Sequence, residues 1–146
     1  MTQTAEFRCG RLAWRFRKSG ADGCYAKEYE NFDEPTRTKL LELAGLDPTE
    51  LAAIGCYFDD QNWVLVTDQR LRWSVAGTRK TLALSEIEDA TVEPRAMHLA
   101  GTKQRLTELT VVTSRGDRHH LQIEAGAPFS GFWNALKMAA TWNGPT

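Results

Sequence analysis

The stretch that most constrains the fold runs from Asn62 to Val75, NWVLVTDQRLRWSV. Two apolar runs, 63–66 and 71–75, flank the polar step TDQR at 67–70. β-Branched and aromatic residues on both sides of a short polar step are typical of a β-hairpin, because such side chains suit a pleated, half-buried surface. The hairpin predicts that the rest of the chain supplies further antiparallel strands.

Short apolar runs separated by short polar connections continue after this hairpin. One connection is different: residues 94–105, PRAMHLAGTKQR, are long for a hairpin loop, and we expect a basic loop there. The predicted strands cover residues 54–59, 62–67, 70–76, 79–84, 87–93, 106–114 and 117–124.

The end of the chain changes from a strand pattern to a helix pattern. Phe129, Phe132, Trp133 and Leu136 stand at positions i, i+3, i+4 and i+7. This spacing places all four side chains on one face of a helix, so an amphipathic C-terminal helix that packs on the strands is expected.

The N-terminal segment predicts a strand. In GRLAWRFRK, residues 10–18, Leu12, Trp14 and Phe16 alternate with arginines. Alternation with period two favours a strand with one buried face and one cationic face, and a helix is the weaker alternative. With a second short strand at residues 24–29, this gives an N-terminal β-hairpin.

The next segment carries helix signals. Asp33 is a suitable N-cap, Pro35 fits an early helical position, and Gly45 is a suitable C-terminal stop, which predicts a helix over residues 33–44. A second cap-and-proline pair at Asp47 predicts a short helical turn at 50–53.

Bulk properties limit the classes of protein. The chain has 146 residues, enough for one domain with a real core, and no apolar run long enough to span a bilayer. The first residues lack the apolar stretch of a signal peptide, so a cytoplasmic location is expected. Three cysteines with no CxxC spacing indicate reduced thiols rather than disulfides or zinc ligands.

Seven strands followed by one helix is also the element order of the pleckstrin-homology (PH) superfold. The segment with Thr67, Asp68, Arg70 and Leu71 resembles the T-(D/E)-x-R-L hairpin of bacterial PH-like and GRAM-like domains. Residues 82–92 resemble the strand pair that follows it, with Ala90 where the pattern has valine, and residues 131–136 resemble the closing helix.

The resemblance implies a mainly β (α+β) fold. In it, residues 54–146 form a PH-like, seven-stranded antiparallel, partly open barrel capped by the C-terminal helix. Residues 1–53 would be an N-terminal β-hairpin and helix extension packed on that domain. Phosphoinositide binding in such folds uses bases in the first hairpin loop, but here residues 58–62 carry two acids and no base. Lipid-headgroup binding at that loop is therefore not expected.

Catalytic and nucleic-acid signals are weak. No Ser/His/Asp set, glycine-rich phosphate loop or HExxH motif is present, so we expect no enzyme activity and no cofactor. His119 and His120 would face opposite sides of a strand, and a metal site would need further ligands nearby. The net charge is −1, and a strand would separate the N-terminal arginines from the aromatic rings, so nucleic acid is not expected as a partner.

These observations favour a non-catalytic, cytoplasmic module that binds a protein or peptide. The alternative is binding of an anionic ligand or a membrane surface (a lipid headgroup) through the basic loop 94–105. The oligomeric state, monomer or homodimer, stays open. The expected binding surface combines exposed charge with one exposed tryptophan: Arg70, Arg72, Trp73, Arg79, Lys80, Arg95, Lys103 and Arg105.

Overall fold

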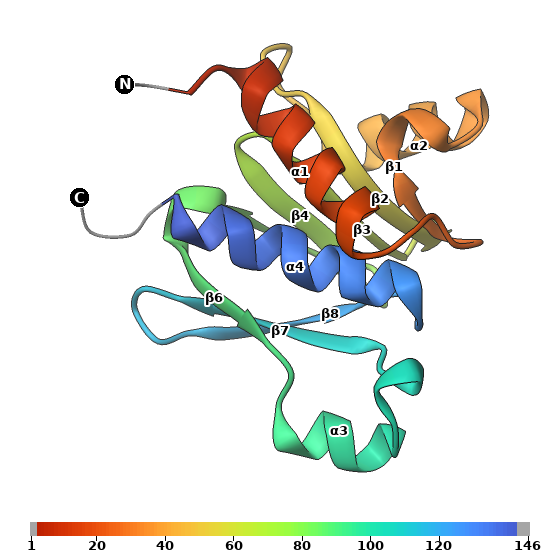
Figure 1. Ribbon diagram of the computed structural model, residues 1–146. Helices are drawn as coiled ribbons and strands as arrows, with labels where there is room; N and C mark the ends of the chain where they lie inside the picture. Colours follow the sequence, from red (N-terminus) through yellow and green to blue (C-terminus); the bar gives the residue numbers. More distant parts are fainter. Residues whose placement is uncertain (1–2, 143–146) are drawn as a thin grey trace.

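The computed structural model describes residues 3–142, an α+β structure of four α-helices and eight antiparallel strands in two sheets (Figure 1). The helices are α1 (Ala5–Ser19), α2 (Glu34–Ala44), α3 (Pro94–Ala100) and α4 (Ala127–Thr141). The strands are β1 (Ala26–Glu28), β2 (Ala52–Asp59), β3 (Asn62–Thr67), β4 (Arg70–Val75), β5 (Thr78–Ala83), β6 (Ile87–Thr91), β7 (Glu108–Thr113) and β8 (Arg118–Gln122). Short 3-10 turns are η1 (Tyr29–Asn31), η2 (Leu84–Glu86) and η3 (Lys103–Arg105).

The predicted hairpin is confirmed as β3 and β4, which pair antiparallel with Trp63 opposite Ser74 and Val66 opposite Leu71. One sheet has the order β1-β2-β3-β4-β5 and the other the order β6-β7-β8. Within residues 3–142 no strand pairing joins the two sheets, so they are not closed into a barrel. They pack against each other instead, with the ring of Trp73 on β4 lying 5.4 Å from the ring of His119 on β8.

The main hydrophobic core lies between the sheets and the helices α1 and α4, which run side by side (Figure 1). Phe16 of α1 meets Phe132 of α4 edge to face, with ring centroids 5.7 Å apart. Gly131 makes this close approach possible, because a Cβ atom there would lie 2.6 Å from the Phe16 ring. The predicted C-terminal helix is therefore confirmed, and α1 is its neighbour.

A second, smaller core lies on the outer face of the five-stranded sheet. Phe32, Leu40 and Ala44 pack there against Trp63 and Leu65 of β3. The inner face of the same strand contributes Val64 and Val66 to the main core. β3 is thus covered on both faces, which explains why its pattern is apolar rather than alternating.

The predicted strand at residues 10–18 is wrong, because this segment is the second half of α1. Leu12 and Phe16 are fully buried at i and i+4, a helical spacing, whereas Trp14 between them is 36% exposed. The Thr4 hydroxyl caps the helix by accepting a hydrogen bond from the Phe7 N–H at 3.0 Å. The N-terminal β-hairpin is therefore also wrong: β1 pairs with β2 instead.

The helix predicted over residues 33–44 is confirmed as α2. The Asp33 side chain accepts the Thr36 N–H at 2.9 Å, and Gly45 ends the helix with a φ of 61°, a left-handed conformation that suits glycine. The helical turn predicted at 50–53 is wrong, because a tight turn closes there and β2 begins at Ala52. The segment expected as a loop, 94–105, contains α3 and η3.

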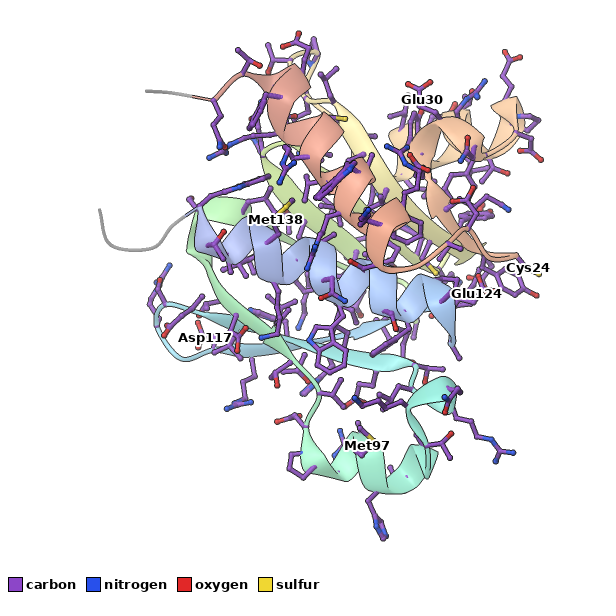
Figure 2. The ribbon with its side chains drawn as sticks, in the orientation of Figure 1. Cys24, Glu30, Met97, Asp117, Glu124 and Met138 are labelled. Atoms are coloured by element: carbon purple, nitrogen blue, oxygen red, sulfur yellow. The ribbon has the colours of Figure 1, made fainter. Side chains whose placement is uncertain are left out.

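One side chain fastens the N-terminal segment to the end of the three-stranded sheet. The Glu124 carboxylate accepts hydrogen bonds from the backbone N–H groups of Cys24, Tyr25 and Ala26 at 2.9, 2.7 and 2.8 Å. Figure 2 shows Cys24 beside Glu124 at this junction. Among residues 3–142, no helix has the length and apolar character needed to cross a membrane.

Candidate functional site

The Thr-Asp-x-Arg step of the hairpin is occupied by internal contacts. The Thr67 hydroxyl oxygen accepts the N–H groups of Gln69 and Arg70 at 3.1 and 2.9 Å, which closes the turn. The Asp68 carboxylate accepts the Leu51 N–H at 2.8 Å and so fixes the segment before β2. The residues that carry the sequence resemblance therefore shape the fold around the candidate site.

A buried carboxylate lies beside this turn. The Glu50 side chain is fully buried and accepts hydrogen bonds from the Thr67 hydroxyl at 2.7 Å and from Arg72 Nη2 at 2.9 Å. Burial alone would raise the pKa of Glu50, but the hydrogen bonds from Thr67, from the Asp47 N–H and from Arg72 outweigh it and lower the pKa below its usual value. Glu50 is therefore a fixed negative charge that orients Arg72.

Arg72 in turn forms part of a groove between α2 and β5. The groove has a volume of about 370 Å³. The C-terminal turn of α2 forms one wall, and Arg79 and Lys80 on β5 form the other, with Trp63 and Arg72 also lining it. The Arg72 guanidinium reaches across to α2, where Nη1 donates to the Ala44 carbonyl at 2.8 Å. We call this feature the α2–β5 groove.

Two hydrogen-bond donors on residues that line the groove have no acceptor. Trp63 is only 2% exposed, and its indole Nε1 makes no hydrogen bond within the described residues. Arg72 Nε, also buried, has no partner either. A buried donor without an acceptor costs about 1–3 kcal/mol relative to one that is satisfied. The groove therefore exposes two cations, Arg79 and Lys80, and both unsatisfied N–H groups are buried behind its surface.

The groove adjoins a sheet edge, because β5 is the last strand in its sheet within residues 3–142. The Leu84 N–H donates a hydrogen bond to the Gln69 carbonyl. The backbone N–H and C=O groups of the even-numbered residues of β5 therefore point toward β4. By the alternation of antiparallel pairs, Arg79 and Thr81 direct their backbone groups away from β4. An exposed strand edge of this kind can pair with an extended peptide.

The predicted binding residues on β4 and β5 differ in how far they are available for binding. Arg79 and Lys80 are exposed and line the groove, and Arg72 lies at its base. Arg70 is only partly available, since its Nη2 atom pairs with Asp47 at 2.9 Å. The expected exposure of Trp73 is wrong: it is 3% exposed and belongs to the main core.

The other predicted residues lie at a different place. Arg95 and Arg105 line a separate depression of about 310 Å³ beside α3. Arg95 also pairs with Glu108 at 2.8 Å. Lys103 is exposed on η3. The structure therefore does not place the eight predicted residues in one cavity.

Sequence reasoning missed two features of this surface and one between α1 and α4. Trp63 looked like an ordinary strand residue, and nothing in the sequence shows that its indole N–H lacks an acceptor. Glu50 looked like a residue of a helical turn. In α1, the side chains of Arg11, Trp14 and Arg15 line one groove with Lys137, so the argument that a strand would separate arginines from rings does not hold. A helical spacing of i, i+3 and i+4 was the available signal.

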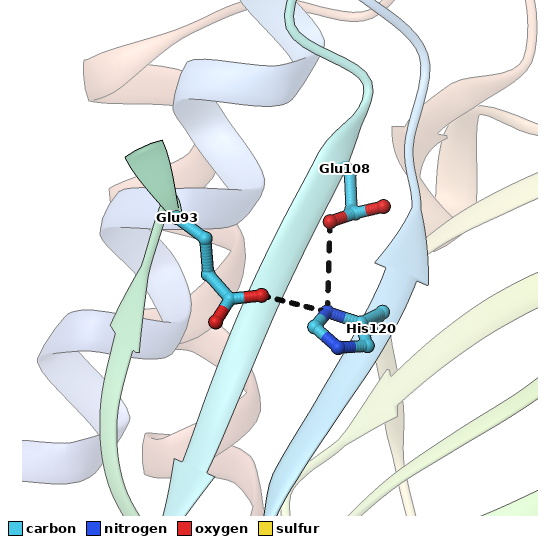
Figure 3. A group of neighbouring side chains, drawn as sticks. All are labelled: Glu93, Glu108 and His120. Carbon is cyan, nitrogen blue, oxygen red and sulfur yellow. Dashed lines mark ion pairs between the residues drawn. The ribbon is translucent and has the colours of Figure 1, made fainter. Parts of the chain in front are cut away.

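One set of described side chains could hold a metal ion: Glu93, Glu108 and His120 on the three-stranded sheet (Figure 3). His119 points the other way, toward Trp73, as expected for adjacent strand residues. Among the cysteines, burial raises the pKa of Cys56 to about 12 and that of Cys9 to about 11, so both thiols stay protonated at neutral pH.

Comparisons of the chain with protein-family models, with curated proteins and with solved structures find no match. The site therefore has to be interpreted from its own geometry.

Proposed function

We propose that this chain is a non-catalytic binding module of PH-like fold, and that its α2–β5 groove takes an acidic peptide segment in extended conformation. The peptide would pair with the edge of β5 and place a carboxylate in the groove. Because main-chain pairing gives affinity with little sequence preference, the groove would supply the selectivity for acid.

The observation that carries this proposal is the pair of exposed cations, Arg79 and Lys80, which line the groove on the edge strand β5. The unsatisfied donors Trp63 Nε1 and Arg72 Nε are buried behind the groove surface, so an acceptor reaches them only when the groove opens. A carboxylate has two acceptor oxygens and a negative charge, so it fits the cations directly.

The PH-like part of the proposal is supported by the order of the elements. From β2 onward, four strands of one sheet are followed by three strands of the other and then by α4. This order agrees with the sequence resemblance of residues 54–146. The helices α1 and α2 and the strand β1 precede it in the chain and pack on it.

The test measures binding of a fluorescent peptide of alternating Glu and Val, with the Gln counterpart as the neutral probe. Fluorescence anisotropy should show binding of the Glu peptide and at least tenfold weaker binding of the Gln peptide. The double variant Arg79→Glu/Lys80→Glu should weaken binding of the Glu peptide by at least about tenfold, because two attractive charges become repulsive. Trp63→Phe removes the indole N–H together with part of a buried ring, and once urea unfolding shows that this variant is folded, it should weaken binding severalfold.

The matched control is Lys103→Glu/Arg105→Glu, which makes the same change of charge beside α3. It should leave the affinity for the Glu peptide within about twofold of the native value. Equal losses in the two double variants would mean that only overall charge matters. That outcome, or equal binding of the Glu and Gln peptides, would refute the groove as the site.

The second candidate function is binding to an anionic membrane surface through α3, which one observation favours. Leu99 on α3 is 72% exposed, the largest exposure among the bulky apolar residues described, and it lines a depression with Arg95 and Arg105. An exposed apolar side chain beside two cations suits an acidic lipid interface. Sedimentation with phosphatidylserine vesicles would then be lost in Lys103→Glu/Arg105→Glu and kept in Arg79→Glu/Lys80→Glu.

A further inference from the structure

A cluster of one imidazole and two carboxylates lies on the outer face of the three-stranded sheet (Figure 3). Glu93 follows β6, Glu108 begins β7 and His120 lies on β8, so each side chain comes from a different strand region. Antiparallel pairing places Glu108 opposite Gln122 and Thr110 opposite His120. The sheet itself therefore brings residues that are up to 27 positions apart in sequence to one place.

The spacing of the ligand atoms is close to that of a metal site. His120 Nδ1 lies 3.5 Å from Glu93 Oε1 and 3.6 Å from Glu108 Oε1, and the three atoms all lie within 4.8 Å of one another. Ligand bonds of about 2.0–2.2 Å in a tetrahedral site place neighbouring ligand atoms roughly 3.4 Å apart. Only a small movement of the two glutamates is needed to close around an ion.

The existing contacts leave most of this ligand set available. Glu93 pairs with Arg118 through Oε2 at 3.3 Å, so its Oε1 can bind an ion while Arg118 holds the carboxylate in place. Such support of a ligand from its far side is typical of metal sites. Glu108 Oε1 pairs with both His120 and Arg95. An ion that binds Glu108 has to displace Arg95 from Oε1 or bind Oε2 instead.

A hydrogen bond also holds the imidazole in place. The Thr110 hydroxyl is fully buried and lies 3.1 Å from His120 Nδ1. An ion bound at that nitrogen replaces this hydrogen bond, because a metal-bound imidazole nitrogen has neither a proton nor a lone pair left for the hydroxyl. The contacts that an ion has to displace are one hydrogen bond to the Thr110 hydroxyl and one ion pair whose arginine is exposed.

We propose that Glu93, Glu108 and His120 form a binding site for a divalent first-row transition-metal ion such as Zn²⁺ or Co²⁺. The imidazole ligand selects against Ca²⁺ and Mg²⁺, which prefer oxygen ligands only. Three protein ligands leave at least one coordination position for water or for an acceptor group of a partner. The site is separate from the α2–β5 groove and does not depend on the proposed function.

The test is a Co²⁺ titration of the untagged full chain, followed by visible absorption and by two-dimensional NMR. Binding should produce d–d absorption bands and should broaden the amide signals near residues 93, 108 and 120 first. Zn²⁺ should displace Co²⁺, and Ca²⁺ should not. His120→Ala should weaken Co²⁺ binding at least about tenfold, a typical effect of losing a ligand or its support.

The matched control is His98→Ala, which removes an exposed histidine from α3. Its Co²⁺ affinity should stay within about twofold of the native value, whereas Glu93→Gln and Glu108→Gln should each weaken binding. Both glutamate changes replace partly exposed side chains and leave the core intact. Unchanged binding in His120→Ala, or first broadening near Cys24 instead of the cluster, would overturn the proposal.

Discussion

The two sheets carry similar sets of carboxylates and cations, but they bury these sets to different degrees. On the five-stranded sheet, α2 covers the outer face, and the Glu50 side chain that pairs with Arg72 is fully buried. On the three-stranded sheet the outer face is open, and the Glu93 and Glu108 side chains are 25% and 20% exposed.

This difference separates charges that hold the fold from charges that are available for binding. A buried carboxylate has lost its water and depends on its protein partners, so removing either side leaves an unpaired group. A partly exposed carboxylate exchanges a protein partner for water at lower cost. The comparison predicts that equivalent substitutions on the two sheets have very different consequences for stability.

The largest effect is expected for Glu50→Gln on the five-stranded sheet. The change keeps the shape of the side chain but removes the negative charge opposite Arg72, which is only 14% exposed. The free energy of unfolding should fall by about 3 kcal/mol, the lower end of the range for breaking a buried ion pair. Urea unfolding followed by tryptophan fluorescence measures this directly, and a loss below about 1 kcal/mol would contradict the structural role of Glu50.

The pH dependence of the free energy of unfolding provides a second test of Glu50. The pKa of Glu50 is lowered in the folded state, so its contribution to stability is fully present above the pKa of an unfolded glutamate, about 4.3. This contribution is lost as the pH falls below that value and through the folded pKa. Glu50→Gln should therefore show a smaller loss of stability between pH 5 and acid than the native chain does.

An intermediate effect is expected at Glu124, which links the two regions. Its carboxylate accepts the three backbone N–H groups of residues 24–26, at the start of β1. In Glu124→Gln the amide nitrogen cannot accept, so at least one N–H loses its partner and the stability should fall by about 1–2 kcal/mol. Hydrogen exchange should speed up at residues 24–26 well before it does in β3, and unchanged exchange there would contradict this role.

The sequence was sufficient to predict the strands, because each carries a local signal. The hairpin 62–75, the cap at Asp33 and the helical spacing from Phe129 to Leu136 all depend on neighbouring residues, and all three are confirmed. The N-terminal segment failed because LAWRF fits both periods: Leu12 and Phe16 are four apart as well as even-numbered. Only the position of α4 decides between the two patterns, and that is tertiary information.

The sites were less predictable than the fold for a related reason. Exposed charge in the sequence identified Arg79 and Lys80, but the unsatisfied Trp63 N–H depends on how α2 packs over β3. His120 was noticed, yet its two carboxylate neighbours come from residues 93 and 108, and only the register of β6, β7 and β8 brings them together. Contacts between distant segments leave no local pattern.

The smallest effect is expected for Glu108→Gln, the counterpart of Glu50→Gln on the open sheet. Its ion pair with Arg95, which is 60% exposed, is worth about 0.5 kcal/mol or less, and the change also relieves repulsion from Glu93. In the presence of a chelator the unfolding midpoint in urea should therefore be close to native. Added Zn²⁺ should stabilise the native chain more than the variant. The reason is that an ion that binds only the folded state stabilises it more the more tightly it binds. A loss of more than about 1 kcal/mol in the chelator would show that the open sheet also relies on its charges, and the contrast between the two sheets would fail.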